Sequence, residues 1–327
     1  SRWRRRVKTI PAMLAVTAAA LLWLPVLVLV AIAVDVVRLR FRFPILRVYL
    51  FLVQYLINDS VEIVLAPIYW AMAGFGTRLG SESSISRHEG LQWWSVRLLQ
   101  KRAEQLLGLR IEIDDPDRSI LGDGPVIVIS RHVSVFDASI PTLVFQPAGF
   151  RVGGVVMAEM LADPGFDLIY GRLGSVFVPR DGGPDAIAGI TDMVDRLGPT
   201  EDTALVIFPE GRLFRPSVRD RLLARLGRSD PVRAERLAGL TNLLPPRPQG
   251  LHTMLSAVPG ADVVVVDHSG FERLRSVSDL LSVVPLDWPI RVRLRRIVRA
   301  EIPDDLQGRT AWLDQLWLDL DEAHQPT

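Results

Sequence analysis

A histidine and an aspartate stand five positions apart, just after a short apolar run that is typical of a buried β-strand. On an ideal helix His132 and Asp137 would point about 140° apart, so they can meet only if the chain bends between them. We therefore expect His132 in the loop after a strand over residues 126–129, and Asp137 near the first turn of the next helix. The carboxylate could then hold one imidazole nitrogen and leave the other to act as a general base. A surface histidine and a helix-capping aspartate would give the same spacing.

A second pattern, G-S-V-F-V-P-R, covers residues 174–180. It predicts a strand that opens with a glycine and ends at Arg180. The planar guanidinium group of an arginine can bind two phosphate oxygens at once, so Arg180 is a candidate phosphate ligand. An ordinary charge at the end of a strand is the alternative interpretation.

A third pattern, V-I-F-P-E-G-R, covers residues 206–212 and runs from a strand into a turn. The proline fixes the backbone, and the glycine permits a positive φ or a close approach by another group. The turn would then present the carboxylate of Glu210 and the guanidinium group of Arg212. A turn without a function is the alternative.

In this order the three patterns, H-x4-D, G-x-x-F-x-x-R and F-P-E-G, resemble those of the glycerolipid (1-acylglycerol-3-phosphate) acyltransferase family. The segment around Arg247, L-P-P-R-P-Q-G, and a late stretch over residues 292–312 are similar to the branch with lysocardiolipin, lysophosphatidylinositol and the longer lysophosphatidic acid acyltransferases. The resemblance covers roughly residues 90 to 320 and implies an O-acyltransferase.

The resemblance implies transfer of a fatty acyl group from acyl-CoA or acyl carrier protein to the free hydroxyl of a lysophospholipid. It makes His132 the general base and Asp137 its orienting partner, with no cofactor and no metal. Lysophosphatidic acid is the first acceptor; lysophosphatidylinositol, another lysophospholipid or an envelope glycolipid are alternatives, as is a non-catalytic lipid-binding protein on the same fold. The residues that it implies for substrate binding are Gly174, Phe177, Arg180, Glu210, Gly211, Arg212 and Arg247.

The elements that would position these residues are short β-rich runs that alternate with helical patterns. Strands separated in this way predict an α/β fold with a mostly parallel central sheet flanked by helices. The runs cover residues 110–113, 126–129, 174–178, 204–208, 263–266 and 290–294. We expect the catalytic domain over residues 91–327.

The N-terminal residues 1–76 predict a membrane anchor. Residues 10–34 carry no charge and, at about 1.5 Å per helical residue, could cross a hydrocarbon core of about 30 Å. Arginines flank this run on both sides, which favours a re-entrant segment bent near Pro25 over a single crossing; a cleaved signal peptide is a third reading. Residues 44–76 predict an interfacial helix pair or a second membrane helix, and residues 77–90 predict a linker.

Composition narrows the possible partners and chemistry. The chain has no cysteine, which excludes a thiol nucleophile and thiolate metal sites, and the histidines show no metal-binding spacing. Of 38 basic residues only Lys8 and Lys101 are lysine, and eight arginines fall within residues 212–236, which suits either anionic lipid or a solvated lid helix. We expect membrane lipids rather than nucleic acid as partners, and a location at the bacterial inner membrane with the catalytic domain on the cytoplasmic side. The oligomeric state is not indicated.

Overall fold

The computed structural model describes residues 2–116, 124–179, 182–198, 200, 202–274 and 276–324. The chain divides into two compact units, which are described separately. The helical unit comprises Ser1–Ile111, Ala158–Ser175 and Arg273–Ile290. The sheet unit comprises Glu112–Met157, Val176–Glu272 and Arg291–Thr327.

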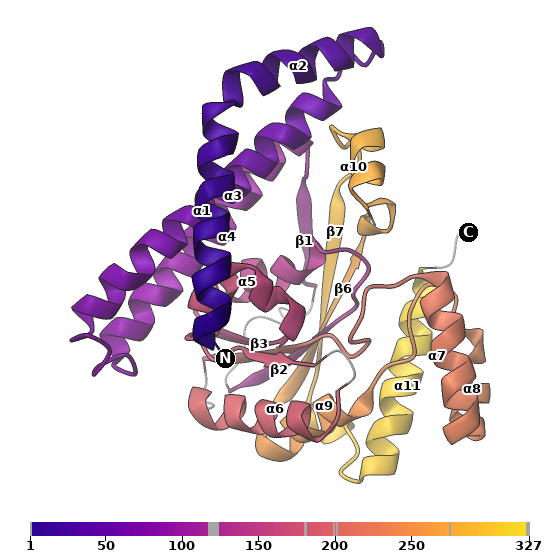
Figure 1. Ribbon diagram of the computed structural model, residues 1–327. Helices are drawn as coiled ribbons and strands as arrows, with labels where there is room; N and C mark the ends of the chain where they lie inside the picture. The colour runs from indigo at the N-terminus through magenta and orange to yellow at the C-terminus, as the bar shows by residue number, and fades with distance from the viewer. Residues whose placement is uncertain are drawn as a thin grey trace. The chain divides into compact units, whose positions relative to one another are not determined.

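A seven-stranded sheet forms the centre of the sheet unit, with the strand order β1-β7-β6-β2-β5-β3-β4 (Figure 1). Strands β2 to β6 pair in parallel with one another, and β7 pairs antiparallel with β6. The predicted α/β fold with a mostly parallel sheet is confirmed. The strands are β1 (Ile111–Asp114), β2 (Val126–Ser130), β3 (Arg151–Met157), β4 (Val176–Val178), β5 (Thr203–Ile207), β6 (Asp262–Ser269) and β7 (Ile290–Ile297).

Strand β3 has no counterpart among the predicted strands. Its sequence begins with Arg151 and contains Gly153 and Gly154, so it lacks the apolar run that marks a strand by sequence. It is held instead by its neighbours, because it pairs with β5 on one side and with β4 on the other.

The core of the sheet unit lies between one face of the sheet and three helices. Alternate strand residues such as Ile127, Leu205 and Val263 pack there against apolar side chains of α6 (Pro184–Leu197), α9 (Pro248–Ala257) and α11 (Leu306–Ala323). The other helical segments with residues in this unit are η1 (Asp137–Ser139), α5 (Ile140–Phe145), α7 (Pro216–Ser229), α8 (Pro231–Arg236), η4 (Leu237–Gly239), η5 (Phe271–Arg273) and η6 (Arg299–Glu301).

The register of the sheet determines which loops meet. Ile129 of β2 is paired with Ile207 of β5, and Ser130 of β2 is paired with Val266 of β6. Because the three strands are parallel, the loops that follow them emerge at the same edge. The residues just after β2, the residues just after β5 and the last residues of β6 are therefore neighbours.

The helical unit contains α1 (Arg2–Leu22), α2 (Leu24–Val37), α3 (Pro44–Met72), α4 (Glu82–Leu107), η2 (Ala158–Ala162), η3 (Phe166–Tyr170) and α10 (Val277–Val283). Helix α3 is one continuous helix of 29 residues rather than a helix pair, and it is long and apolar enough to cross a membrane. Its polar residues Asn58, Asp59 and Glu62 are buried, which explains why they do not interrupt the helix.

Helices α1 and α2 form a bent pair. The break lies at Trp23, the two helices diverge by 67°, and Pro25 occupies the first turn of α2. Together they are long and apolar enough to count as one further candidate membrane segment. The chain then turns back, and the buried carboxylate of Asp35 accepts the Ile45 and Leu46 N–H groups at 3.3 and 3.1 Å, which caps α3.

Helix α4 begins at Glu82, inside the segment that the sequence predicts as a linker. Ser84, His88 and Gln92 are buried along one face of this helix. The imidazole of His88 lies 2.7 Å from the Ser84 carbonyl and 2.9 Å from the Arg172 guanidinium group. A polar buried face of this kind leaves no apolar periodicity in the sequence, which is why the first turns of α4 were placed in the linker, whereas residues 92–107 do predict an amphipathic helix.

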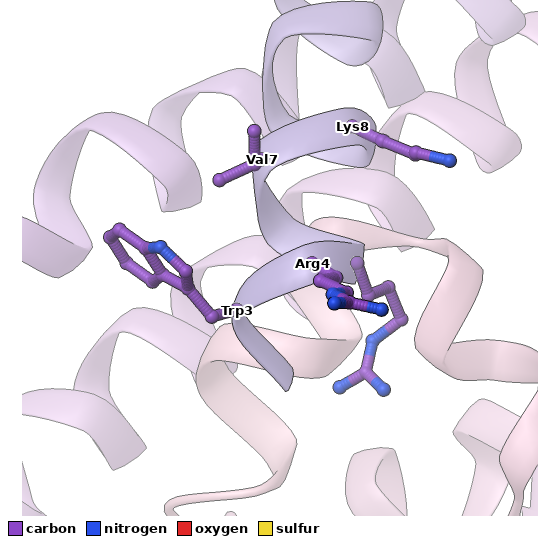
Figure 2. A pocket seen from close by; sticks show the side chains of 5 residues that line it. Trp3, Arg4, Val7 and Lys8 are labelled. Atoms are coloured by element: carbon purple, nitrogen blue, oxygen red, sulfur yellow. The ribbon is translucent and has the colours of Figure 1, made fainter. Parts of the chain in front are cut away.

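The first turns of α1 carry charged and aromatic side chains. An open depression of about 640 Å³ is lined by Trp3, Arg4, Arg5, Val7 and Lys8 (Figure 2). Arg5 and Arg6 also bind the Asp167 carboxylate of η3 at 2.8 and 3.1 Å.

Candidate active site

His132 and Asp137 are in direct contact at the carboxyl end of β2. The Nδ1 atom of His132 lies 2.6 Å from Oδ1 of Asp137, and the Asp137 side chain is fully buried. The other oxygen, Oδ2, accepts the N–H groups of Val133 at 2.7 Å and of Ser134 at 2.9 Å. Asp137 is the first residue of η1, so the chain bends between the two residues as their spacing predicts.

The carboxylate fixes the orientation of the imidazole. With Nδ1 engaged by Asp137, Nε2 is the nitrogen that can accept a proton from a substrate. The ring packs against Phe208, with the ring centroids 4.6 Å apart, and the His132 side chain keeps 17% of its surface exposed. This arrangement can perform general-base chemistry.

Glu210 supports the His132 loop from the neighbouring strand. Its Oε1 accepts the His132 N–H and its Oε2 accepts the Leu244 N–H, both at 3.0 Å, and the side chain is fully buried. Burial raises the pKa of Glu210 to about 7, although the two backbone N–H groups act in the opposite direction. The carboxylate is thus turned into the protein, and its effect on a substrate would be indirect.

Gly211 and Arg247 lie beside this loop. Gly211 has a φ of +63°, and a Cβ atom at this position would lie 3.5 Å from Nη1 of Arg247. The Arg247 N–H donates to the Pro209 carbonyl at 2.8 Å, and Phe214 N–H donates to the His132 carbonyl at 2.9 Å. The structure therefore brings the third motif and Arg247 to the loop that carries His132.

The second motif lies farther along the sheet. Gly174 has a φ of +80° just before β4, and Phe177 is paired with Val156 of β3. Two strands, β5 and β3, stand between β4 and β2. Arg180 lies outside the described residues. Arg212, of the third motif, is partly buried.

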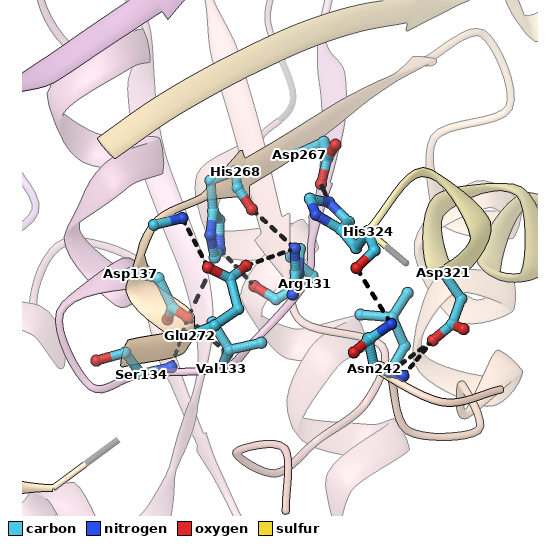
Figure 3. A network of polar contacts seen from close by, with 12 residues as sticks. Arg131, Val133, Ser134, Asp137, Asn242, Asp267, His268, Glu272, Asp321 and His324 are labelled. Atoms are coloured by element: carbon cyan, nitrogen blue, oxygen red, sulfur yellow. Dashed lines mark hydrogen bonds and ion pairs between the residues drawn. The ribbon is translucent and has the colours of Figure 1, made fainter. Parts of the chain in front are cut away.

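Two residues of this edge of the sheet have no role in the sequence-based prediction. His268, the seventh residue of β6, is fully buried, and its Nε2 lies 3.2 Å from the Arg131 carbonyl oxygen and 3.6 Å from Oδ2 of Asp137 (Figure 3). Arg131 donates to the His268 carbonyl at 2.9 Å and pairs with Glu272 at 3.0 Å. Only the register of β2 and β6 could have indicated these contacts.

A second His–Asp pair lies in the same polar network. Nε2 of His324, just after α11, is 2.7 Å from Oδ1 of Asp267 (Figure 3). Burial raises the pKa of Asp267, but the hydrogen bond from His324 and the nearby charges of His324, Arg131 and His268 together outweigh it, and the net shift is downward. This pair joins the end of α11 to β6. Within the described ranges, no group of three or more His, Asp or Glu residues has the arrangement of a metal site.

Residues 110–267, slightly less than half of the chain, match the family model described as Acyltransferase. The chain is also similar to a solved structure, the 1-acyl-sn-glycerophosphate (LPA) acyltransferase PlsC from Thermotoga maritima, with 14% identity and a TM-score of 0.50. This similarity covers 86% of the present chain and 99% of that chain, and at such low identity it shows a shared fold. No curated protein gives a significant match. The part of the chain that is similar to the Acyltransferase family model, residues 110–267, thus contains His132, Asp137 and Glu210.

Proposed function

We propose that the protein is a membrane-bound O-acyltransferase that moves a fatty acyl group from an acyl thioester to the free hydroxyl of a lysophospholipid. The acceptor in this proposal is lysophosphatidic acid and the product is phosphatidic acid. The observation that supports it is the 2.6 Å contact between His132 and the buried Asp137, within the residues that match the Acyltransferase family model. The donor is acyl-CoA or acyl carrier protein, which enters as a cosubstrate.

The chemistry needs one general base and no covalent enzyme intermediate. Nε2 of His132 takes the hydroxyl proton, and the alkoxide attacks the carbonyl carbon of the thioester. The C–S bond of the tetrahedral intermediate then breaks, and the leaving thiolate receives the proton from the imidazolium group. Asp137 stabilises that imidazolium group and holds its orientation.

The oxyanion of the tetrahedral intermediate needs hydrogen-bond donors other than the first three N–H groups of the loop that carries His132. The N–H groups of His132, Val133 and Ser134 already donate to the carboxylates of Glu210 and Asp137. These three amides shape the loop, so other donors would stabilise the developing charge.

The phosphate of the acceptor is assigned to the arginines of the motifs. Arg247, beside Gly211, and Arg212 have the guanidinium geometry that suits a phosphate group. Arg180 has the same chemistry and follows β4 in the sequence. Phe177 lies on β4, and Gly174 precedes it. Lysophosphatidylinositol or another lysolipid would use the same cations.

We further propose that the helical unit attaches the protein to the membrane and that the catalytic domain faces the cytoplasm. Helix α3 has the length and apolar character of a membrane span, and the bent pair α1–α2 has them together. A lipid acceptor with a long acyl chain is reached most directly by an enzyme held at the bilayer surface.

The test is release of free thiol from palmitoyl-CoA by the purified, detergent-solubilised chain, with a panel of lysolipids. We expect release that depends on the added lysolipid and a phospholipid product of matching mass. Release without an acceptor would instead indicate a hydrolase, and no release with any lysolipid, from either CoA or carrier-protein donors, would contradict the proposal.

The matched pair of variants is His132→Ala and His252→Ala. Loss of the general base is expected to lower the rate by about 10²- to 10⁴-fold. His252 is a partly buried histidine on α9 whose Nε2 lies 3.4 Å from Thr310, so its loss controls for removal of an imidazole as such. A folded His132→Ala variant with an unchanged rate would remove His132 from the mechanism.

A further inference from the structure

The sheet places a second imidazole on the far side of the catalytic carboxylate. Ser130 of β2 is paired with Val266 of β6, so His132 and His268 each follow the paired residues by two positions. Nε2 of His268 lies 3.6 Å from Oδ2 of Asp137, while Nδ1 of His132 lies 2.6 Å from Oδ1. The carboxylate of Asp137 thus stands between two imidazoles.

The hydrogen bonds of His268 define its tautomer. Its Nε2 is 3.2 Å from the carbonyl oxygen of Arg131, and a carbonyl accepts only from an N–H group, so the proton is on Nε2. The same N–H group lies near Oδ2 of Asp137. Its Nδ1 atom is buried, and the described residues offer it no hydrogen-bond partner. A second proton there would be a buried donor without an acceptor, which disfavours the charged ring.

The surrounding charges also favour a neutral ring. Burial is the main cause that lowers the pKa of His268, and the nearby charge of Arg131 acts in the same direction. Asp137 and Asp267 act in the opposite direction but do not outweigh burial. Glu272 faces Arg131, and the Phe271 ring packs edge-on against the imidazole with the centroids 5.4 Å apart.

We propose that His268 is a positioning residue for acyl transfer: its Nε2–H group donates to the Arg131 carbonyl and faces Oδ2 of Asp137, and so holds the His132–Asp137 pair in its reactive geometry. This proposal rests on the proposed function, because the geometry that it protects is that of the general base. A neutral donor leaves the charge of Asp137 available to the imidazolium group that forms on His132.

Arg131 gives this arrangement its stiffness. Its guanidinium group is fully buried and donates to the His268 carbonyl at 2.9 Å, while the His268 ring donates to the Arg131 carbonyl at 3.2 Å (Figure 3). The two residues therefore join the ends of β2 and β6 reciprocally, directly before the loop that carries His132. A small displacement of a reacting group can lower a rate by about 10²-fold, so the Arg131–His268 contacts that hold this loop in place are significant for catalysis.

Three variants of His268 separate a donor role from simple filling of space. His268→Phe keeps a ring but has no N–H group. His268→Gln can place an amide N–H near the position of Nε2, whereas the shorter His268→Asn can place one only near Nδ1, on the side without a partner. In the Phe and Asn variants we expect kcat to fall by about tenfold or more, with KM values within about twofold of the wild-type values. In the Gln variant we expect kcat to recover substantially.

A second measurement does not depend on turnover. In the ¹H NMR spectrum of the detergent-solubilised chain, the proton in the His132–Asp137 hydrogen bond is expected at low field and should disappear in Asp137→Asn. It should shift or broaden in His268→Phe and stay in place in the control His252→Gln. If the wild-type chain transfers no acyl group, the proposed function fails, but the NMR signal still tests whether His268 positions the His132–Asp137 pair.

The result that would overturn the proposal is a folded His268→Phe variant with normal kcat and an unchanged low-field proton. Equal activity of the Gln and Asn variants would also overturn it, since the position of the N–H group would then not matter. A lower kcat together with higher KM values for both the acyl donor and the acceptor would indicate a general structural role and would overturn the proposal too. Comparison of Gln with Asn keeps the test valid if the Phe variant does not fold.

Discussion

At the scale of single residues, the site depends on carboxylates whose two oxygens do different work. Asp137 orients the imidazole with Oδ1 and gathers two backbone N–H groups with Oδ2. Glu210 likewise bonds one N–H group on each oxygen and joins the His132 loop to residue 244. The same side chains therefore affect both the chemistry and the folding of the loop.

The variant Asp137→Asn should lose activity and stability together. An amide has one acceptor oxygen, so its NH₂ group must face either the imidazole or the loop amides. We expect kcat to fall by about 10²- to 10⁴-fold and the free energy of unfolding to fall by about 1 to 3 kcal/mol. His132→Ala is the control, because it removes the base but keeps the loop amides bonded to Asp137. Steady-state kinetics and urea unfolding measure both effects; equal stability losses in the two variants would contradict this account.

Glu210 predicts a pH dependence of stability. Its pKa is raised from 4.5 to about 7 in the folded chain, so the folded state binds a proton more tightly than the unfolded state. The stability that this provides is fully present below about pH 4.5 and is lost as the pH rises through about 7. Glu210→Gln does not titrate, and the wild-type advantage in unfolding free energy over it should therefore shrink between pH 5 and pH 8. An advantage that grows with pH would mean that the two N–H donors outweigh burial.

At the scale of elements, the sequence predicted six of the strands, with shifts of at most three residues at their ends. Strand β3 was missed because its apolar content is low and its pairing partners are distant in the chain. For helix α3 the sequence left a helix pair and a single helix open, because Asn58, Asp59 and Glu62 interrupt its apolar run; in the structure these three residues are buried. Local patterns thus identify an element when its own apolar residues mark the face that is buried. They fail when the element is held by contacts with segments that are distant in the sequence.

The ion pair between α8 and α11 is an example of two helices that are held together by side chains distant in the sequence. Arg233 binds the fully buried Asp314 at 2.7 Å and is itself only 13% exposed. Asp314→Ala leaves a buried guanidinium group without its carboxylate, so we expect a loss of about 3 to 5 kcal/mol in the free energy of unfolding. The control is Asp220→Ala, which breaks the exposed pair with Arg219 and should cost less than about 1 kcal/mol. Urea denaturation of both variants measures the difference, and similar losses would contradict it.

At the scale of the whole molecule, both arginine clusters around the first apolar run contact later segments of the helical unit. Arg5 and Arg6 bind Asp167, which precedes β4, and Arg42 donates to the Pro285 carbonyl, which precedes β7, at 2.8 Å. We propose that both clusters lie on the same side of the membrane, because positive charges that flank an apolar run favour the cytoplasmic side.

This topology can be tested with single cysteines, because the chain has none of its own. Arg4→Cys and Arg38→Cys place a thiol at an exposed position at each end of the bent pair α1–α2. We expect a membrane-impermeant maleimide to label both in inside-out vesicles and neither in intact spheroplasts. Labelling of the two positions from opposite sides would contradict the re-entrant arrangement and support a single crossing.

The sequence by itself determined the features that lie within one short segment: the H-x4-D pair at the end of a strand, the Pro-Glu-Gly turn, the apolar runs and the alternation of strands and helices. Only the tertiary structure decided which of these loops meet. The contacts of His132 with Glu210, and of Asp137 with His268, join residues 78 and 131 positions apart in the numbering. They depend on the register of parallel strands, and that register is set by packing of the whole sheet rather than by any local pattern.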